Sequence, residues 1–168
     1  MKTLLSLTLL LSLAVLFSAC PVSTSYPLEK KGAVKIDKAL LGEWETDVED
    51  AEVQRILFKQ GTETNTYAVT VLERGSMFMA DGDDFTGWLA ELGGKRFLVL
   101  QQVIDGVAQE TYYVYNIEIS GNKLVSHDIS LKVGGTDAIT SVQAYQEEVL
   151  ASMKMEDFLA SEMIWSKK

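Results

Sequence analysis

Residues 111–133, TYYVYNIEISGNKLVSHDISLKV, carry the clearest structural pattern of the chain. Hydrophobic residues occupy alternate positions on both sides of Gly121-Asn122, and a period of two indicates a β-strand with one buried face. The alternating residues are Tyr113, Tyr115, Ile117 and Ile119 before the turn, and Val125, His127, Ile129, Leu131 and Val133 after it. Because Gly-Asn is a typical two-residue turn, the stretch predicts a hairpin of strands 111–120 and 123–133.

The same period and similar turn signals recur through the preceding part of the chain. Gly93-Gly94, for example, separates two further apolar runs. We predict about eight strands, over residues 42–47, 52–59, 65–73, 76–80, 84–91, 95–103, 111–120 and 123–133. Short connections produce an antiparallel meander, and a meander of this length protects its edges best by closing. The predicted fold class is all-β, an antiparallel up-and-down barrel, with a sandwich or half-open barrel as the alternative.

The period changes after Gly135, where a helix is expected. Thr140-Ser141-Val142-Gln143 matches a capping box, in which Thr140 would cap the first free amides. An apolar stripe at helical spacing follows, made of Val142, Tyr145, Val149 and Met153. The sequence therefore predicts one C-terminal helix on the outside of the sheet, followed by a short final strand at residues 163–165.

The N-terminal segment, residues 1–20, reads MKTLLSLTLLLSLAVLFSAC and has the layout of a secretory signal. Its apolar run would be about 20 Å long as a helix, shorter than the roughly 30 Å of a hydrocarbon core. Phe17-Ser18-Ala19-Cys20 resembles the lipobox of bacterial lipoproteins. That resemblance implies removal of a signal peptide, residues 1–19, and a diacylglycerol anchor with palmitate-type chains on Cys20. An ordinary signal that leaves Cys20 as a free thiol is the alternative.

The resemblance also implies a location in the bacterial cell envelope. Pro21, rather than Asp, follows Cys20, which by analogy with such lipoproteins favours the periplasmic face of the outer membrane. Residues 20–38 contain both prolines of the chain together with several hydroxyl residues and lysines. This composition predicts a flexible tether, which would let the domain of residues 39–168 stand clear of the headgroups.

A second resemblance concerns the start of that domain. Leu41-Gly42-Glu43-Trp44, after a helical turn expected at residues 37–40, resembles the Gly-x-Trp signature of lipocalins. The resemblance implies an eight-stranded barrel in which Trp44 packs across the closed floor. In that family an arginine of the last strand stacks on the tryptophan. Here no arginine follows Arg96, and Lys167 is the candidate substitute.

Composition excludes several functional classes. The formal net charge is −9, which argues against binding to nucleic acid. Cys20 is the only cysteine and His127 the only histidine, so neither a disulfide nor a three-histidine metal site can form within the chain. Without a Gly-x-Ser-x-Gly elbow or a phosphate-binding loop, we predict no catalytic residues, no cofactor, no metal and no enzymatic activity.

The interior of the barrel is where we expect a function. Strand parity predicts an inward-facing set of Tyr67, Val69, Tyr113, Tyr115, Ile117, Val125 and His127. Within it, Tyr67, Tyr113, Tyr115 and His127 are the candidate ligand-binding residues, because an apolar pocket with few polar groups is typical of small-molecule sites. The chain is thus interpreted as an anchored module for a small apolar or amphipathic ligand. The alternative is a structural or interaction lipoprotein whose core is filled by paired hydroxyls, with an unidentified protein partner.

Overall fold

The computed structural model of the protein describes residues 23–48, 51–76, 78 and 80–168. In chain order the strands and helices are β1 (Ser23–Thr24), the 3₁₀ helix η2 (Lys38–Leu40), β2 (Gly42–Glu45), β3 (Val53–Gln60), β4 (Tyr67–Arg74), β5 (Asp84–Leu92), β6 (Lys95–Ile104), β7 (Val107–Ser120), β8 (Lys123–Ile129), the 3₁₀ helix η3 (Thr136–Ala138), α2 (Val142–Ser152) and β9 (Leu159–Lys167). Cys20 lies outside the described residues.

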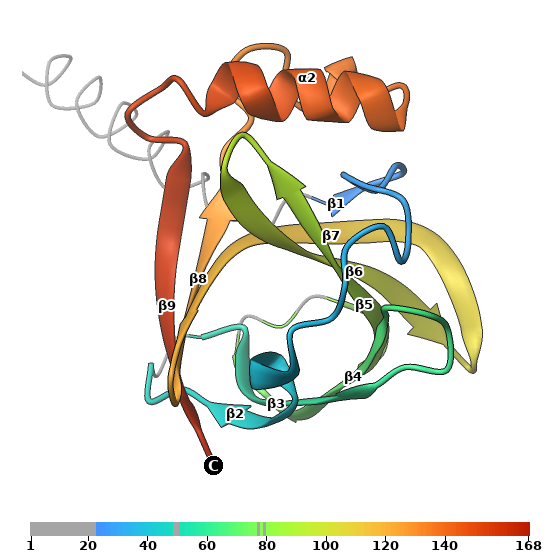
Figure 1. The fold of residues 1–168 in the computed structure, drawn as a ribbon, viewed down its shortest axis with the longest axis vertical. Helices are drawn as coiled ribbons and strands as arrows, with labels where there is room; N and C mark the ends of the chain where they lie inside the picture. Colours follow the sequence, from blue (N-terminus) through green and yellow to red (C-terminus); the bar gives the residue numbers. More distant parts are fainter. Residues whose placement is uncertain (1–22, 49–50, 77, 79) are drawn as a thin grey trace, which may run out of the picture.

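The strands form one antiparallel sheet in the order β1-β7-β6-β5-β4-β3-β2-β9-β8. An additional pairing of β7 with β8 closes strands β2 to β9 into an eight-stranded barrel (Figure 1). The two predicted hairpins are present, because Leu92 pairs with Lys95 around Gly93-Gly94 and Ser120 pairs with Lys123 around Gly121-Asn122. The predicted up-and-down barrel with one C-terminal helix is therefore confirmed.

Two strand predictions are wrong in detail. The described residues of segment 76–80 form no strand, and Phe78 and Ala80 instead face the interior of the barrel. The final strand is not a short addition at residues 163–165. β9 is 9 residues long and completes the barrel by pairing with both β8 and β2. The number of barrel strands is still eight because β9 replaces the segment 76–80.

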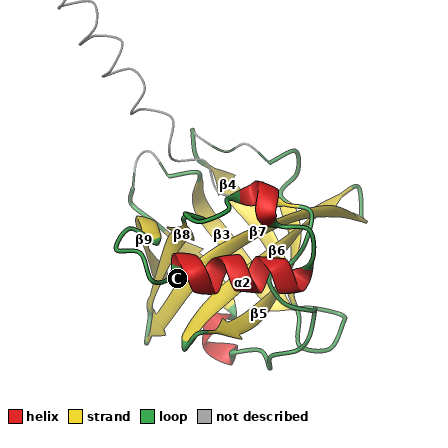
Figure 2. Cartoon of the chain, turned by 90° about the horizontal axis from the view of Figure 1, so that it is seen from above, coloured by secondary structure: helices red, strands yellow, loops and turns green. Residues whose placement is uncertain are grey.

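Hydrophobic residues pack in two layers, one inside the barrel and one beneath α2. The inner layer includes Trp44, Phe58 and Leu98, and the outer layer includes Trp88 and Phe97. Helix α2 lies across the outside of the sheet and covers the outer layer with Tyr145 and Val149 (Figure 2). Strands β5 and β6 are consequently buried on both faces, which is why their apolar residues show no simple alternation.

Helix α2 begins one residue later than the capping box predicted. Ser141, not Thr140, is the N-cap, and its Oγ accepts a hydrogen bond of 3.1 Å from the Ala144 amide. Inside the helix, Glu148 is only 6% exposed and its carboxylate accepts bonds from the amides of Val133 and Gly134 at 3.0 and 2.8 Å. This carboxylate connects α2 to the chain that leaves β8.

The described residues of the predicted tether, 23–38, are packed against the barrel rather than free. β1 pairs with β7, Ser23 opposite Tyr113. Leu28 is fully buried in the outer layer, and the Trp88 indole donates a hydrogen bond of 2.9 Å to the carbonyl of Glu29. The polar composition that suggested a linker therefore belongs to a segment held by a few buried contacts, and the folded unit begins before residue 39.

The floor of the barrel is formed by Leu40, Trp44 and Lys167. Trp44 is fully buried, and its indole donates to the Leu40 carbonyl at 2.8 Å. The Lys167 ammonium lies 5.2 Å from the centre of a Trp44 ring and donates to the Ala39 carbonyl at 2.8 Å. Lys167 therefore makes a cation–π contact with Trp44 at the floor.

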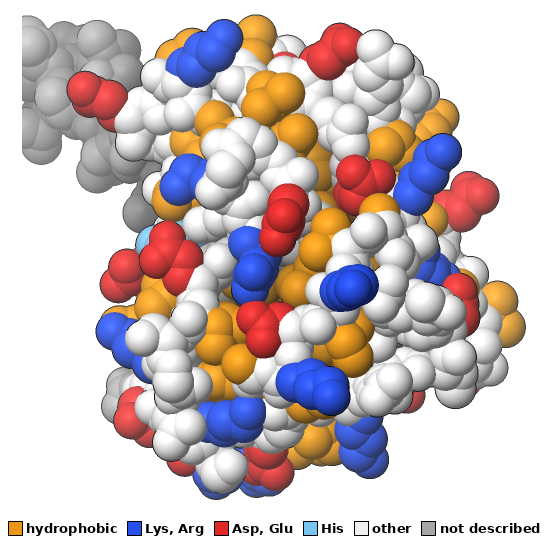
Figure 3. Space-filling model, viewed as in Figure 1, with side chains coloured by type: hydrophobic (Ala, Val, Ile, Leu, Met, Phe, Trp, Pro, Cys, Tyr) orange, Lys and Arg blue, Asp and Glu red, His pale blue; other side chains and the backbone are white. Residues whose placement is uncertain are grey.

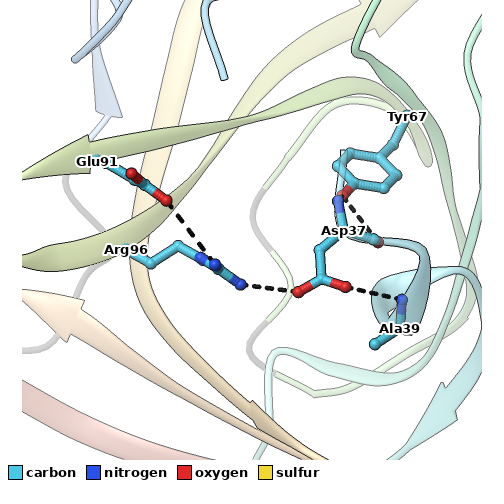
Figure 4. Close-up of polar contacts among 5 residues, drawn as sticks. All are labelled: Asp37, Ala39, Tyr67, Glu91 and Arg96. Carbon is cyan, nitrogen blue, oxygen red and sulfur yellow. Dashed lines mark hydrogen bonds and ion pairs between the residues drawn. The ribbon is translucent and has the colours of Figure 1, made fainter. Parts of the chain in front are cut away.

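Asp37 holds the segment at the start of η2 in place next to the floor (Figure 4). Its carboxylate caps η2 through the Ala39 amide at 2.9 Å and accepts a bond from Arg96 at 2.8 Å. Its backbone is held by the Tyr67 hydroxyl, which accepts from the Asp37 amide at 2.6 Å and donates to the Asp37 carbonyl at 3.1 Å. Tyr67 is therefore a buried structural residue at the closed end.

Candidate functional site

The barrel encloses a cavity of about 610 Å³ above the floor. Most of its wall is hydrophobic and comes from strands β3 to β9 and from the segment between β4 and β5. The hydrophobic lining residues are Val53, Ile56, Phe58, Val71, Phe78, Ala80, Phe85, Leu98, Leu100, Tyr113, Tyr115, Ile117, Leu124, Met163 and Trp165, and the other lining residues are Glu52, Ser126, Asp128 and Ser161.

Four polar groups lie at one end of this cavity, which we name the polar end: the carboxylates of Glu52 and Asp128 and the hydroxyls of Tyr115 and Ser161. Glu52 directly precedes β3, Asp128 is the penultimate residue of β8, and Ser161 is near the start of β9. Because neighbouring strands are antiparallel, these positions lie at the same end of the barrel, opposite the floor. Ser161 is exposed while it lines the cavity, so the polar end opens to solvent.

An irregularity in β9 positions Ser161. Ser126 pairs with Met163 and Asp128 with Ala160, so β9 contains one residue more than β8 across this interval, which is a β-bulge. Ser161 adopts a φ of 43°, a left-handed conformation that is unfavourable for a residue other than glycine. The bulge lies beside Asp128, and the Ser161 side chain acts to lower the pKa of that carboxyl.

Burial dominates the electrostatics of the polar end. Desolvation, together with repulsion from Asp128, raises the pKa of Glu52 to about 7. Desolvation also raises the pKa of Asp128, although the bond from Ser161 and the charge of His127 oppose that shift. The pKa of the Tyr115 hydroxyl lies well above its usual range, again chiefly because of burial. Ionising either carboxylate therefore costs more free energy in the folded protein than in an exposed position.

Two of the four sequence-predicted site residues line the cavity, and two do not. Tyr113 and Tyr115 face it as expected. Tyr67 is fully buried but is bonded to Asp37 at the closed end. His127 was assigned to the wrong face of β8: Ser126 and Asp128 point inward, while His127 lies outside with its Nε2 3.8 Å from Glu162.

The error at His127 has a physical cause. Ile129, which shares a face with His127, packs in the outer layer under α2, so the more apolar face of β8 is its outer face. The prediction from strand parity took the apolar face as the inner one and for the same reason placed Val125 inside. It therefore missed Asp128, and with it Glu52 and Ser161. Asp128 could have been predicted from the two-residue turn at Gly121-Asn122, because this turn fixes which residues pair across the hairpin.

Within the described part of the chain, no helix is long and apolar enough to span a membrane, and no three His, Cys, Asp or Glu side chains are grouped as metal ligands. No family model and no curated protein matches the chain. It is similar to the crystal structure of a DUF4909 family protein from Staphylococcus aureus subsp. aureus Mu50, with 15% sequence identity and a TM-score of 0.41 over 79% of this chain and 100% of that chain. This similarity is too low to carry an argument about fold or function.

Proposed function

We propose that this protein is a lipid-anchored binding module of the bacterial envelope, which holds a small apolar or amphipathic molecule inside its barrel. The observation that carries the proposal is the cavity above the floor. Its volume of about 610 Å³ falls within the roughly 300–1,000 Å³ of typical ligand pockets. A wall that is hydrophobic apart from a few polar groups at one end suits a ligand with an apolar body and one polar group.

The cavity favours this function over the alternative of a lipoprotein with a filled core. Native interiors are close-packed and contain few voids larger than a water molecule, so an unfilled space of this size is unusual in a purely structural domain. A small molecule in the cavity would recover the contacts that the wall now lacks. The anchor rests on the lipobox-like sequence at Cys20, and by the same analogy the periplasmic face of the outer membrane is the favoured location.

Native mass spectrometry of the full chain carrying Cys20→Ser tests the binding function without interference from the lipid anchor. We expect a small molecule to remain bound to the folded protein. Ala80→Phe should displace it, because Ala80 lines the cavity and a phenyl ring there would fill part of the space. Ala68→Phe is the matched control, since Ala68 is exposed on β4. A ligand-free wild-type barrel that also binds none of a panel of apolar compounds would overturn the proposal.

A further inference from the structure

The polar end of the cavity is a carboxylate pair without a positive partner. Among the described residues that line the cavity, none is Lys, Arg or His. Neither Glu52 nor Asp128 takes part in any of the ion pairs between described side chains. The charge of His127 reaches Asp128 only from the opposite face of β8. The cavity is thus more uniformly acidic than the outer surface, where side chains of both signs are interspersed (Figure 3).

The Tyr115 hydroxyl adds a second, independent feature. Tyr115 is directly opposite Asp128 across β7 and β8, its side chain lines the cavity, and burial strongly affects its hydroxyl. No hydrogen bond within the described structure satisfies that hydroxyl. Tyr115 is partly exposed and lines the cavity, so its unbonded hydroxyl is available there to pair with a polar atom of a bound molecule.

We propose that the ligand is an amphipathic cation, a protonated amine on an apolar body, whose ammonium group lies between Glu52 and Asp128. This inference rests on the proposed binding function and specifies its ligand class. An ammonium group supplies the missing positive charge and relieves the repulsion between the two carboxylates. It also donates hydrogen bonds in several directions, so the Tyr115 hydroxyl can accept one. The apolar body then fills the hydrophobic remainder towards the floor.

The same geometry disfavours an anionic amphiphile. A fatty acid whose head lay at the polar end would place a third carboxylate beside Glu52 and Asp128, with no basic residue in the wall to offset the repulsion. If its head pointed towards the floor instead, a charge would be desolvated among apolar side chains. A neutral alcohol with the same chain avoids both costs and gains only the hydrophobic contacts.

Three probes with one tail separate these cases: decylamine, decanol and decanoate, titrated by calorimetry below their micelle-forming concentrations into the full chain carrying Cys20→Ser. We expect decylamine to bind at least about tenfold more tightly than decanoate at pH 8, which corresponds to about 1.4 kcal/mol. Decanol should lie between them. Glu52→Gln combined with Asp128→Asn should abolish the preference for decylamine over decanoate.

Glu118→Gln is the matched control, because Glu118 is exposed and lies on the outer face of β7. Binding of decanoate as tight as that of decylamine in the wild type would overturn the inference while leaving the binding function intact. Failure of all three probes would overturn both. The wild-type comparison alone is decisive, so the result does not depend on how well the double variant folds.

Discussion

Tyr115 on β7 and Asp128 on β8 are directly opposite each other in the closing hairpin of the barrel, and both side chains line its cavity. Residues that face each other across an antiparallel pair share one face of the sheet. This pair therefore sets a phenol beside a carboxylate, both on the inner wall. Together with Glu52 and Ser161 from neighbouring segments, this pair makes one end of the cavity polar, while the rest of the wall is hydrophobic.

Glu52 should make the protein less stable as the pH rises. Its folded-state pKa of about 7 lies above the ordinary value of 4.5, so between these values the folded state binds more protons than the unfolded state. Stability is then lost from about pH 4.5 to 7 and constant above. Glu52→Gln should be more stable than wild type at pH 8 by about 1 to 2 kcal/mol, a value reduced for the solvent that still reaches this side chain.

Urea unfolding between pH 4 and 8 measures this difference. Glu118→Gln, on the outer face of β7, should follow the wild-type curve at every pH. Parallel curves for wild type and Glu52→Gln would show that Glu52 is not desolvated in the folded protein.

Glu148 should have the opposite pH dependence. Although desolvation acts to raise its pKa, the bonds from Gly134, Val133 and Ser152 hold that pKa below its usual value. The stabilisation is present above the unfolded pKa of 4.5 and disappears as the pH falls through the lower, folded pKa. Glu148→Gln at neutral pH should lose about 1 to 3 kcal/mol, because an amide cannot replace both acceptor oxygens.

Thermal melts at pH 7 and pH 3 check this expectation, with a smaller difference between the two proteins at pH 3. The neighbouring Glu147→Gln is the control, since Glu147 is exposed and accepts a hydrogen bond from Gln143 one turn away. Equal losses for the two variants would contradict a special role for Glu148.

Gly94→Val should destabilise the hairpin between β5 and β6 through the backbone alone. Gly94 has a φ of 77°, and a side chain added there would meet no atom within 4 Å. The left-handed conformation costs an ordinary residue roughly 1 to 2 kcal/mol, and a β-branched residue more. Gly94→Asn should be nearly neutral because asparagine tolerates this conformation. Similar melting temperatures for the two variants would argue against the turn described here.

Anchoring through Cys20 is tested by metabolic labelling with palmitate. We expect the wild type to incorporate label into the mature protein, and Cys20→Ser to incorporate none and either fail to mature or be released in soluble form. Recovery of an unlabelled mature wild type would remove the basis of the lipoprotein proposal. The ligand-binding experiments would be unaffected, because they use the unlipidated chain.

The hairpin of residues 111–133 shows how far the sequence could lead. Its strands and turn follow from alternation and from Gly121-Asn122. The same turn pairs Ser120 with Lys123, and counting back places Asp128 opposite Tyr115. An inward Tyr115 therefore requires an inward Asp128, so Tyr115 and His127 could not both line the cavity. The pairing register of the hairpin therefore shows which face of β8 points into the barrel. The hydrophobicity of β8 does not show it, because the outer face is apolar where α2 covers it.

Other features depend on contacts between segments far apart in the chain. Glu52 reaches the cavity because of the barrel closure, and no local pattern distinguishes it from the acidic residues before it. Leu28 is buried by α2 and β5, although its neighbours have the composition of a linker. Whether inward side chains leave a cavity or fill the space depends on the fit of many residues together, so the 610 Å³ cavity could not be predicted.

Strand β1 limits how an anchored protein could sit at a bilayer. It begins at Ser23, which pairs with Tyr113 on the cavity wall. Ser23 is three positions after Cys20 in the sequence, so the chain between them spans at most about 10 Å. If Cys20 carries a lipid, the anchor is therefore no more than about 10 Å of chain away from Ser23, which limits how far the barrel can move from the membrane surface. A ligand-binding barrel anchored in this way would exchange an amphipathic molecule with the nearby membrane surface rather than with the surrounding water.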